Sequence, residues 1–461
     1  MDKLTFKEKL GYGCASVGDA VSYMFVTTFV MFFLTTVAGL QPAVAGTLTA
    51  IAAVWDALVN PIIGYLSDNA RTRWGRRRPF MIGFCVPLFI FTTLLFTTVN
   101  VSYGMKVVYY GFMVIAFWTS FTGFFVPYYA LGPSYTKSYE ERATIRSYAS
   151  FFNMVGTLFS MAMPTTIVQK LHESGMTEAR AWQITAVFLE TITVISIAIT
   201  VIASKNKDVC EDIEEENLQP REKLNLIKMF REYIEVLKLG PMRWLLLTSL
   251  FYLTGYAMIM ADFVYMLTYR MGFDGNGISM AMVVRCLIII CAIPIINKLS
   301  NSTDKRTVQL AILIFGITGI VALRFVEINS TGMLIVFIFI TGILTQTYWQ
   351  IMPAIFYDVC EYDEFETGKR REGTILSVQG FVEAIAAGFG AQFLGIILQF
   401  AGFDGSAEVQ SQTAMEWVYN CTTWVPAILL LVAVFTLWKY PLTKEKYNEI
   451  LAILAERKKN K

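Results

Sequence analysis

The sequence has few of the side chains on which enzymes and nucleic-acid-binding proteins depend. Only 16% of its 461 residues are Asp, Glu, Lys or Arg, and it has 1 histidine, His172. Soluble domains carry about 25% charged residues, so this chain cannot cover its surface with charge. Because it lacks the residues for a Ser/His/Asp triad or a histidine metal site, we expect no enzyme activity and no cofactor.

Paired cysteines and a strong charge of one sign are also missing. None of the 7 cysteines forms a Cys-x-x-Cys pair, and most lie in apolar runs, which is typical of buried thiols. The formal net charge of +2 argues against a nucleic-acid partner. No cleavable signal peptide is recognisable, because residues 1–10 lead into an apolar stretch that is too long for one.

Apolar residues dominate what is present. They make up 55% of the chain, and the mean hydropathy is +0.52. A spanning helix needs about 20 mainly apolar residues, and polar breaks divide the chain into runs of this length. The twelve predicted spans are 11–38, 43–68, 79–99, 106–135, 145–169, 181–203, 242–270, 277–299, 307–326, 332–358, 374–401 and 415–439. We therefore predict an all-α membrane protein that is embedded in a lipid bilayer.

Basic residues are concentrated on one side of the predicted membrane. The clusters 71–78, 205–238, 369–371 and 439–461 fall on that side, whereas the other side has little beyond Lys106, Lys170, Arg180 and Arg270. The positive-inside rule makes the basic side cytosolic, so both termini are predicted to lie in the cytosol. The membrane is predicted to be the cytoplasmic membrane of the cell.

A charged stretch divides the chain into two similar parts. We predict a six-helix bundle over 1–204, a cytosolic linker over 205–240 with an amphipathic helix at 222–238, a second six-helix bundle over 241–440 and a cytosolic tail over 441–461. Two pseudo-repeated six-helix bundles around a long central loop resemble the major facilitator fold, in which the halves move about a midplane site.

Ionisable residues inside spans are candidate functional groups, because a charge at the bilayer centre costs about 2.5–3.5 kcal/mol. Asp56 and Asn60 lie one helical turn apart and, with Thr122, offer the oxygen atoms that Na⁺ prefers. Asp56 is equally suited to carry a proton, or to form only a hydrogen bond with a neighbouring helix. This group is the candidate cation site.

A second set of residues suits a sugar. Asp19 can accept hydrogen bonds from hydroxyl groups, and the aromatic residues Tyr23, Tyr129 and Trp349 can stack on a sugar ring, although ordinary packing is the alternative. Gln379 and Glu383 form another pair one turn apart, within a small-residue stretch that also suits close helix packing.

Three further features complete the residue-based predictions. Asp262 and Arg285 are expected to pair, either structurally or functionally, and Glu190 is expected deep in its span. Charged residues at the cytosolic turns are candidate gating salt bridges, with a role in topology alone as the alternative. These gating candidates are Asp68, Arg76, Arg142, Asp358, Glu361 and Arg370.

Five segments together resemble the glycoside–pentoside–hexuronide:cation symporter family. They are 55–64, 71–79, 126–131, 141–145 and 358–373, of which the last, DVCEYDEFETGKRREG, is the longest and most specific. The resemblance implies Na⁺- or H⁺-coupled uptake of a sugar or glycoside by alternating access. It also implies that Asp19, Tyr129, Trp349 and Gln379 contact the sugar, and that Asp56 and Thr122 contact the cation.

Several positions depart from the family pattern. Asn60 stands where the resemblance implies a second cation-binding aspartate, Phe125 where it implies a second sugar-binding aspartate, and Ala384 where it implies a lysine. The sugar-binding arginine falls at Ala149 or Ser150, one turn after Arg146. A carrier of a less polar solute, an uncoupled facilitator and a non-transporting sensor are therefore open alternatives. We expect a monomer.

Overall fold

The computed structural model describes residues 4–70, 72–135, 139–205, 226–368, 371–405, 407 and 409–459. These ranges contain helices and no strand, apart from an isolated bridge between Thr72 and Gly75. Twelve helical segments in the described part of the chain are long and apolar enough to span a membrane, which confirms the predicted number. The protein is therefore a multi-pass, all-helical membrane protein.

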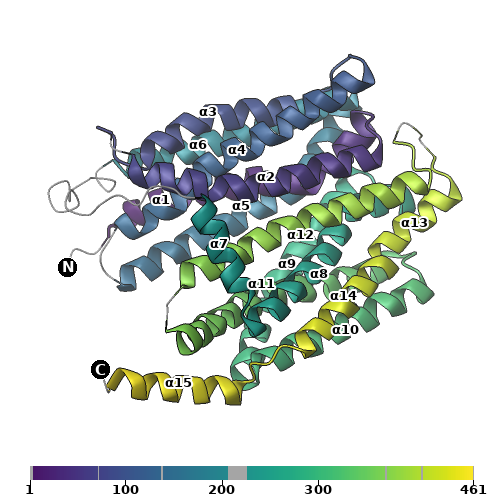
Figure 1. The fold of residues 1–461 in the computed structure, drawn as a ribbon. Helices are drawn as coiled ribbons and strands as arrows, with labels where there is room; N and C mark the ends of the chain where they lie inside the picture. Colours follow the sequence, from purple (N-terminus) through teal and green to yellow (C-terminus); the bar gives the residue numbers. More distant parts are fainter. Residues whose placement is uncertain are drawn as a thin grey trace. The chain divides into compact units, whose positions relative to one another are not determined.

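The predicted spans correspond to helices in the same order (Figure 1). The elements are α1 (Phe6–Phe32), η1 (Phe33–Val37), α2 (Pro42–Asn69), α3 (Arg78–Leu95), α4 (Tyr103–Tyr135), α5 (Tyr139–Glu173), α6 (Glu178–Ala203), α7 (Leu226–Leu237), α8 (Gly240–Tyr265), η3 (Met266–Arg270), α9 (Gly275–Ser302), α10 (Lys305–Val326), α11 (Thr331–Thr367), α12 (Glu372–Phe400), α13 (Gln412–Thr422), α14 (Trp424–Trp438) and α15 (Lys444–Lys459). The last predicted span is divided at Thr423 into α13 and α14.

The chain forms two compact units. Unit 1 comprises Met1–Leu224, Phe273–Met282 and Phe403–Gln410, and unit 2 comprises Asn225–Gly272, Val283–Gly402 and Ser411–Lys461. In unit 1, α1 packs against α5 and α6, and α3 packs against α4 and α6. In unit 2, α8 packs against α12 and α14, and α10 packs against α11 and α14. The second helix set thus repeats the packing order of the first.

Glycines at corresponding places allow the closest helix contacts. A Cβ atom on Gly156 of α5 would lie 2.6 Å from the carbonyl oxygen of Val17 on α1. A Cβ atom on Gly390 of α12 would lie 2.7 Å from the carbonyl oxygen of Thr254 on α8. Small residues let backbones approach in membranes, where packing drives helix association, so these two glycines bring α1 and α8 close to their partners.

The first spanning helix of each half ends in the same irregular way. A five-residue π turn follows α1 as η1, and another follows α8 as η3. Gly39 (φ 73°) and Gly272 (φ 64°) then adopt left-handed backbone conformations before α2 and α9 begin. Glycine suits both positions because it has no Cβ atom to clash there.

Two helices in unit 2 are not spans. The helix α7 falls within the predicted amphipathic segment 222–238 and contacts α12 and α8. The helix α15 in the tail contacts α11, where Arg457 donates to the carbonyl oxygen of Phe365 at 2.9 Å.

Candidate functional site

A carboxylate and an amide meet inside unit 1. Asp19 lies on α1 and is 5% exposed, and the side-chain amide of Asn153 on α5 donates to its Oδ2 at 3.1 Å. The contact follows from the close packing of α1 on α5. Arg146 and the Tyr129 hydroxyl also lie close enough to interact with the Asp19 carboxylate. These groups form a polar cluster that can accept hydrogen bonds from a solute and also donate hydrogen bonds to it.

Aromatic side chains continue from this cluster along one face of α4. Phe121, Phe125 and Tyr129 follow one another at one-turn spacing, with ring centroids 5.4 Å and 4.4 Å apart. The ring of Tyr23 on α1 lies 5.7 Å from that of Phe121. The structure therefore joins the predicted residues Asp19, Tyr23 and Tyr129 into one region, and Phe125 is part of the same aromatic row.

Arg146 is the basic residue nearest to the place where the family pattern has a sugar-binding arginine. Its guanidinium carbon lies 4.7 Å from the centroid of the Tyr129 ring, which is a cation–π contact. Both side chains are exposed within unit 1, and Tyr129 is 37% exposed. A basic group thus lies one turn before the positions 149 and 150 that the family pattern indicated.

The candidate cation site links α2 to α4. The Thr122 hydroxyl donates to Asp56 Oδ1 at 2.5 Å. The Asn60 side-chain nitrogen donates to the Asp56 carbonyl oxygen at 2.7 Å, so that bond does not use the Asn60 side-chain oxygen. Carboxylate, hydroxyl and amide oxygens from Asp56, Thr122 and Asn60 are the ligand types that hard cations prefer.

The candidate solute residues of unit 2 form a separate polar group. Glu383 Oε1 accepts hydrogen bonds from the Gln379 amide at 2.8 Å and from the Tyr348 hydroxyl at 3.1 Å. The Tyr252 ring packs against Tyr348 at 4.7 Å. Trp349, the next residue of α11, is 49% exposed, and its ring lies 5.5 Å from Tyr348. Tyr348 is the residue that connects Trp349 to the Gln379–Glu383 pair.

Glu190 is completely buried in unit 1, as the sequence predicted. Its Oε1 accepts from the Ser22 hydroxyl at 2.9 Å, and Ser22 also lies 3.1 Å from the Thr193 hydroxyl. Its Oε2 has no hydrogen-bond partner among the residues that the structure describes. Glu190 therefore belongs to the interior of the α1–α6 contact.

The expected pair of Asp262 and Arg285 does not form. Asp262 is fully buried on α8, and neither carboxylate oxygen has a hydrogen-bond partner within the described ranges. The Arg285 guanidinium instead donates to the hydroxyls of Thr341 at 3.1 Å and Thr345 at 3.2 Å. The reason is that Arg285 faces two threonines one turn apart on α11.

The candidate gating residues of unit 1 lie at one end of its helices. Asp68 Oδ1 lies 3.3 Å from Arg77, the residue after the predicted Arg76. Lys9 and Glu141 form a second ion pair at 2.9 Å. The side chain of Arg142 lies outside the described residues, so its gating role stays a prediction.

In unit 2, the gating candidates Asp358 and Glu361 each have a partner among the described residues. Asp358 pairs with Lys305 at 2.8 Å, and Glu361 accepts from the Tyr447 hydroxyl at 3.4 Å. Arg371 pairs with Asp363, whereas Arg370 lies outside the described residues. Asp358 is taken by Lys305 because the start of α10 lies beside that part of α11.

The pairing of Arg371 with Asp363 is bidentate. The two nitrogen–oxygen distances are 2.9 Å and 2.6 Å, and the Asp363 carboxylate is fully buried. A third contact joins Arg371 to Glu235 of α7 at 2.9 Å. The hydrogen bonds to Asp363 raise the pKa of the Arg371 guanidinium above its usual value. This network ties α7 to the start of α12.

Sequence reasoning missed three residues of these groups. Asn153 and Tyr348 are single polar side chains in long spans, and Asp363 is one of several acidic residues in a turn. A polar residue in an apolar run was the available signal for Asn153, but its partner Asp19 is 134 residues away.

Comparison with known proteins assigns the chain to a family. A family model described as MFS/sugar transport protein matches residues 11–444. An uncharacterized symporter, YnaJ of Bacillus subtilis (strain 168), is 26% identical over 99% of this chain and 96% of its own length. The isoprimeverose transporter of Lactiplantibacillus pentosus is 25% identical over 95% of this chain and 89% of its own length.

Two further similarities agree with this assignment. The glucuronide carrier protein homolog of Escherichia coli (strain K12) is 24% identical over 99% of this chain and 97% of its own length. The crystal structure of the nucleoside transporter NupG shares the fold, with a TM-score of 0.70, 11% identity and coverage of 94% of this chain and 99% of the other. The chain therefore belongs to the MFS/sugar transport protein family, among the glycoside–pentoside–hexuronide symporters of the major facilitator superfamily, and is a secondary transporter rather than an enzyme.

Proposed function

We propose that this transporter imports a sugar or glycoside together with Na⁺ or H⁺ across the cytoplasmic membrane, with both termini in the cytosol. The observation that carries the proposal is the hydrogen bond between Asn153 and Asp19 beside the aromatic row of α4. A carboxylate accepts from sugar hydroxyls, an amide donates to them, and aromatic rings stack on the apolar face of the sugar. The similarity to an isoprimeverose transporter and to a glucuronide carrier protein homolog supports the same solute class.

The coupling ion is assigned to the group on α2 and α4. Asp56, Thr122 and Asn60 supply oxygen atoms for Na⁺, and Asp56 alone suffices for a proton. Ion binding at Asp56 and solute binding at Asp19 would both occur within unit 1, so the ion can influence solute affinity through the helices of that unit. The protein is proposed to work as a monomer.

A second candidate solute is less polar than a sugar, or amphipathic. Phe125 supports it, because this side chain stands in the aromatic row between Phe121 and Tyr129 at the place where the family pattern has a carboxylate. An uninterrupted aromatic row favours an apolar surface on the solute. In this variant of the proposal the carrier can also act without a coupling ion.

Counterflow in proteoliposomes separates the candidates. Vesicles that contain the purified chain are loaded with an unlabelled glycoside, and uptake of the labelled glycoside is followed with and without Na⁺ and with and without a pH gradient. Exchange that depends on Na⁺ or on pH supports coupled glycoside transport. Exchange of amphipathic glycosides alone, without ion dependence, supports the second candidate. No exchange with any member of the panel would refute both.

A further inference from the structure

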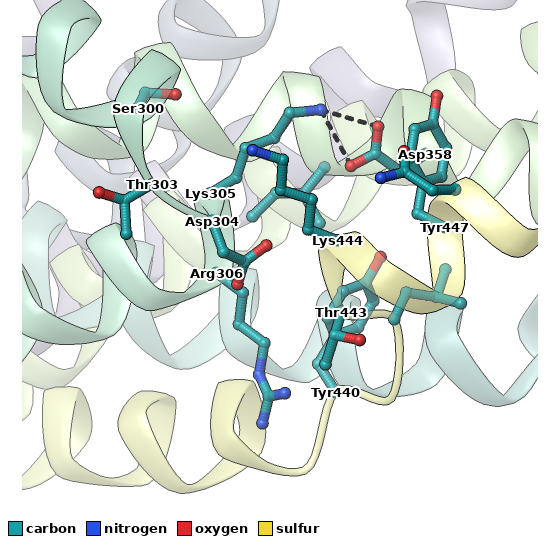
Figure 2. A pocket seen from close by; sticks show the side chains of 13 residues that line it. Ser300, Thr303, Asp304, Lys305, Arg306, Asp358, Tyr440, Thr443, Lys444 and Tyr447 are labelled. Carbon is teal, nitrogen blue, oxygen red and sulfur yellow. Dashed lines mark hydrogen bonds and ion pairs between the residues drawn. The ribbon is translucent and has the colours of Figure 1, made fainter.

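One end of unit 2 contains a cavity that has no part in the solute or cation groups. Its volume is about 240 Å³, and Figure 2 shows its lining side chains. They come from the end of α9, the start of α10, α11 and the segment that leads into α15. Because water occupies about 30 Å³ per molecule in the liquid, this space is large enough for a phosphate group with several waters.

Both carboxylates at the cavity already have partners. Asp358 accepts two hydrogen bonds from Lys305 at 2.8 Å and 3.0 Å, drawn as dashed lines in Figure 2. Asp304 caps α10 by accepting from the backbone N–H of Thr307 at 3.2 Å. Asp358 is therefore neutralised by Lys305, whereas Asp304, which accepts from the neutral N–H and hydroxyl groups of Thr307, keeps its negative charge.

The cavity lining is positively charged overall, because its three basic side chains, Lys305, Arg306 and Lys444, outnumber the carboxylates of Asp304 and Asp358. Among the residues that the structure describes, Arg306 donates only to the carbonyl oxygens of Leu437 and Trp438, which carry no formal charge. No carboxylate in the described part of the chain pairs with Lys444. A lysine ammonium offers three donors and no acceptor, so an anion is the ligand that suits it.

Tyr440 adds a donor that lacks an acceptor. Its side chain lines the cavity and is 2% exposed, and its hydroxyl has no hydrogen-bond partner among the described residues. Burial raises the pKa of the Tyr440 phenol well above its usual value, so the group stays an O–H donor. A buried polar group without a partner destabilises the folded chain, and a ligand oxygen in the cavity would accept from this hydroxyl and remove the cost.

Two helices begin at the cavity. The first residue of α10 is Lys305 and the first residue of α15 is Lys444, and both residues line the space. The N-terminal end of a helix carries a partial positive charge and unpaired N–H groups, which favour anions and phosphates in particular. The two helix N-termini therefore favour an anion in the cavity, as the basic side chains do.

The neighbouring residues are typical of a membrane surface. The last span ends at Trp438, which is 59% exposed, and the Lys439 ammonium lies 4.8 Å from the centroid of its ring. Tryptophan and lysine gather at the level of lipid headgroups. Because Tyr440, two residues after Trp438, lines the cavity, we expect the cavity at headgroup depth.

We propose that this cavity binds the phosphate of an anionic phospholipid headgroup, with Lys444 as its charge partner and the Tyr440 hydroxyl as a hydrogen-bond donor. Basic pockets between spanning helices bind such headgroups by the same chemistry. A soluble phosphate ester offers the same group, and the test must therefore distinguish the two sources. The site is independent of the transported solute.

The test measures the thermal stability of the full-length chain in a neutral detergent. Dioctanoyl phosphatidylglycerol is titrated against dioctanoyl phosphatidylcholine, inorganic phosphate and glycerol 3-phosphate. We expect saturable stabilisation by phosphatidylglycerol. Charge-assisted hydrogen bonds contribute more than neutral ones, so Lys444→Ala should weaken the apparent affinity about tenfold and Tyr440→Phe about fivefold.

Lys446→Ala is the matched control, because Lys446 is an exposed lysine on the same helix that does not line the cavity. It should bind phosphatidylglycerol like the unaltered protein. Stabilisation by inorganic phosphate or glycerol 3-phosphate, lost in Lys444→Ala, would support the site with a soluble source. Equal losses in Lys444→Ala and Lys446→Ala would overturn the proposal, as would stabilisation by none of the four probes.

Discussion

The hydroxyl of Thr122 on α4 donates to the carboxylate of Asp56 on α2 at 2.5 Å, and this bond connects two spanning helices. A hydroxyl in this position can donate to the carboxylate when the site is empty of cations and offer its oxygen lone pairs when an ion is bound. The same pair thus suits both a structural contact and an ion ligand set, and mutations separate the two roles.

Replacement of Asp56 by asparagine should eliminate ion dependence while solute exchange survives, because the amide cannot supply the charge that binds Na⁺ or H⁺. Thr122→Val should weaken the apparent ion affinity about tenfold, since a hydrogen bond to a charged group contributes about 1.5–3 kcal/mol. Ion-dependent counterflow measures both effects.

The control for these variants is Thr119→Val. Thr119 lies one turn earlier on α4 and accepts a hydrogen bond from Trp55 of α2 at 2.8 Å, so the variant disturbs the same pair of helices without touching a carboxylate. Unchanged ion dependence in Asp56→Asn would remove Asp56 from the coupling site.

Removal of the Asp19 carboxylate should abolish solute binding, because sugar hydroxyls would lose their acceptor. Asn153→Ala should weaken solute binding about tenfold, because it removes the amide that donates a hydrogen bond to the Asp19 carboxylate and orients it. Solute-induced thermal stabilisation reports both changes. As a matched control, Asn69→Ala removes an exposed asparagine whose side chain donates to the carbonyl oxygen of Tyr65 in its own helix. Full affinity in Asp19→Ala would place the solute elsewhere.

The ion pair between Arg371 and Asp363 should dominate the stability of the turn between α11 and α12. Arg371→Ala removes the counter-charge of the fully buried Asp363 carboxylate and leaves it the Thr367 hydroxyl, at 3.2 Å, as a neutral donor, so we expect a loss of about 3 kcal/mol. Glu235→Ala removes the partly exposed third member, for which we expect about 0–1 kcal/mol. Thermal unfolding of the two variants compares them directly, and similar losses would mean that Asp363 is not the principal partner.

Substitution of Gly156 by alanine should separate α1 from α5. The added Cβ atom would meet the Val17 carbonyl oxygen at 2.6 Å and the Ala20 Cβ atom at 2.9 Å, and overpacking of this kind costs about 1–3 kcal/mol. Gly380→Ala on α12 is the control, since its added Cβ atom would meet nothing within 4 Å. A midpoint of thermal unfolding that falls in both variants alike would argue against close packing as the cause.

The sequence was sufficient to predict the number and order of the spans, because the length of an apolar run identifies a spanning helix whichever helices it packs against. It also located α7 within the predicted segment 222–238, where the apolar residues repeat with the helical period. The division of the last span at Thr423 was not predicted, although Pro426 in the first turn of α14 was an available signal, because proline suits the first turn of a helix and interrupts a continuous one.

The partners of polar residues were much harder to predict. Neighbours on one helix follow from spacing, so the bond between Gln379 and Glu383 matches the predicted pair. Partners on different helices depend on which faces meet, and the expected pair Asp262–Arg285 is wrong for this reason. The same limitation explains why Asn153 was missed.

The two π turns and the left-handed glycines that follow them bear on the origin of the chain. In each half a π turn follows the first spanning helix, and a left-handed glycine, Gly39 or Gly272, precedes the next helix. Helix packing alone does not require this arrangement to occur in both halves. Such a shared irregularity is expected if a gene for one half was duplicated and fused. The candidate cation group at Asp56 would then be a point at which the two copies diverged.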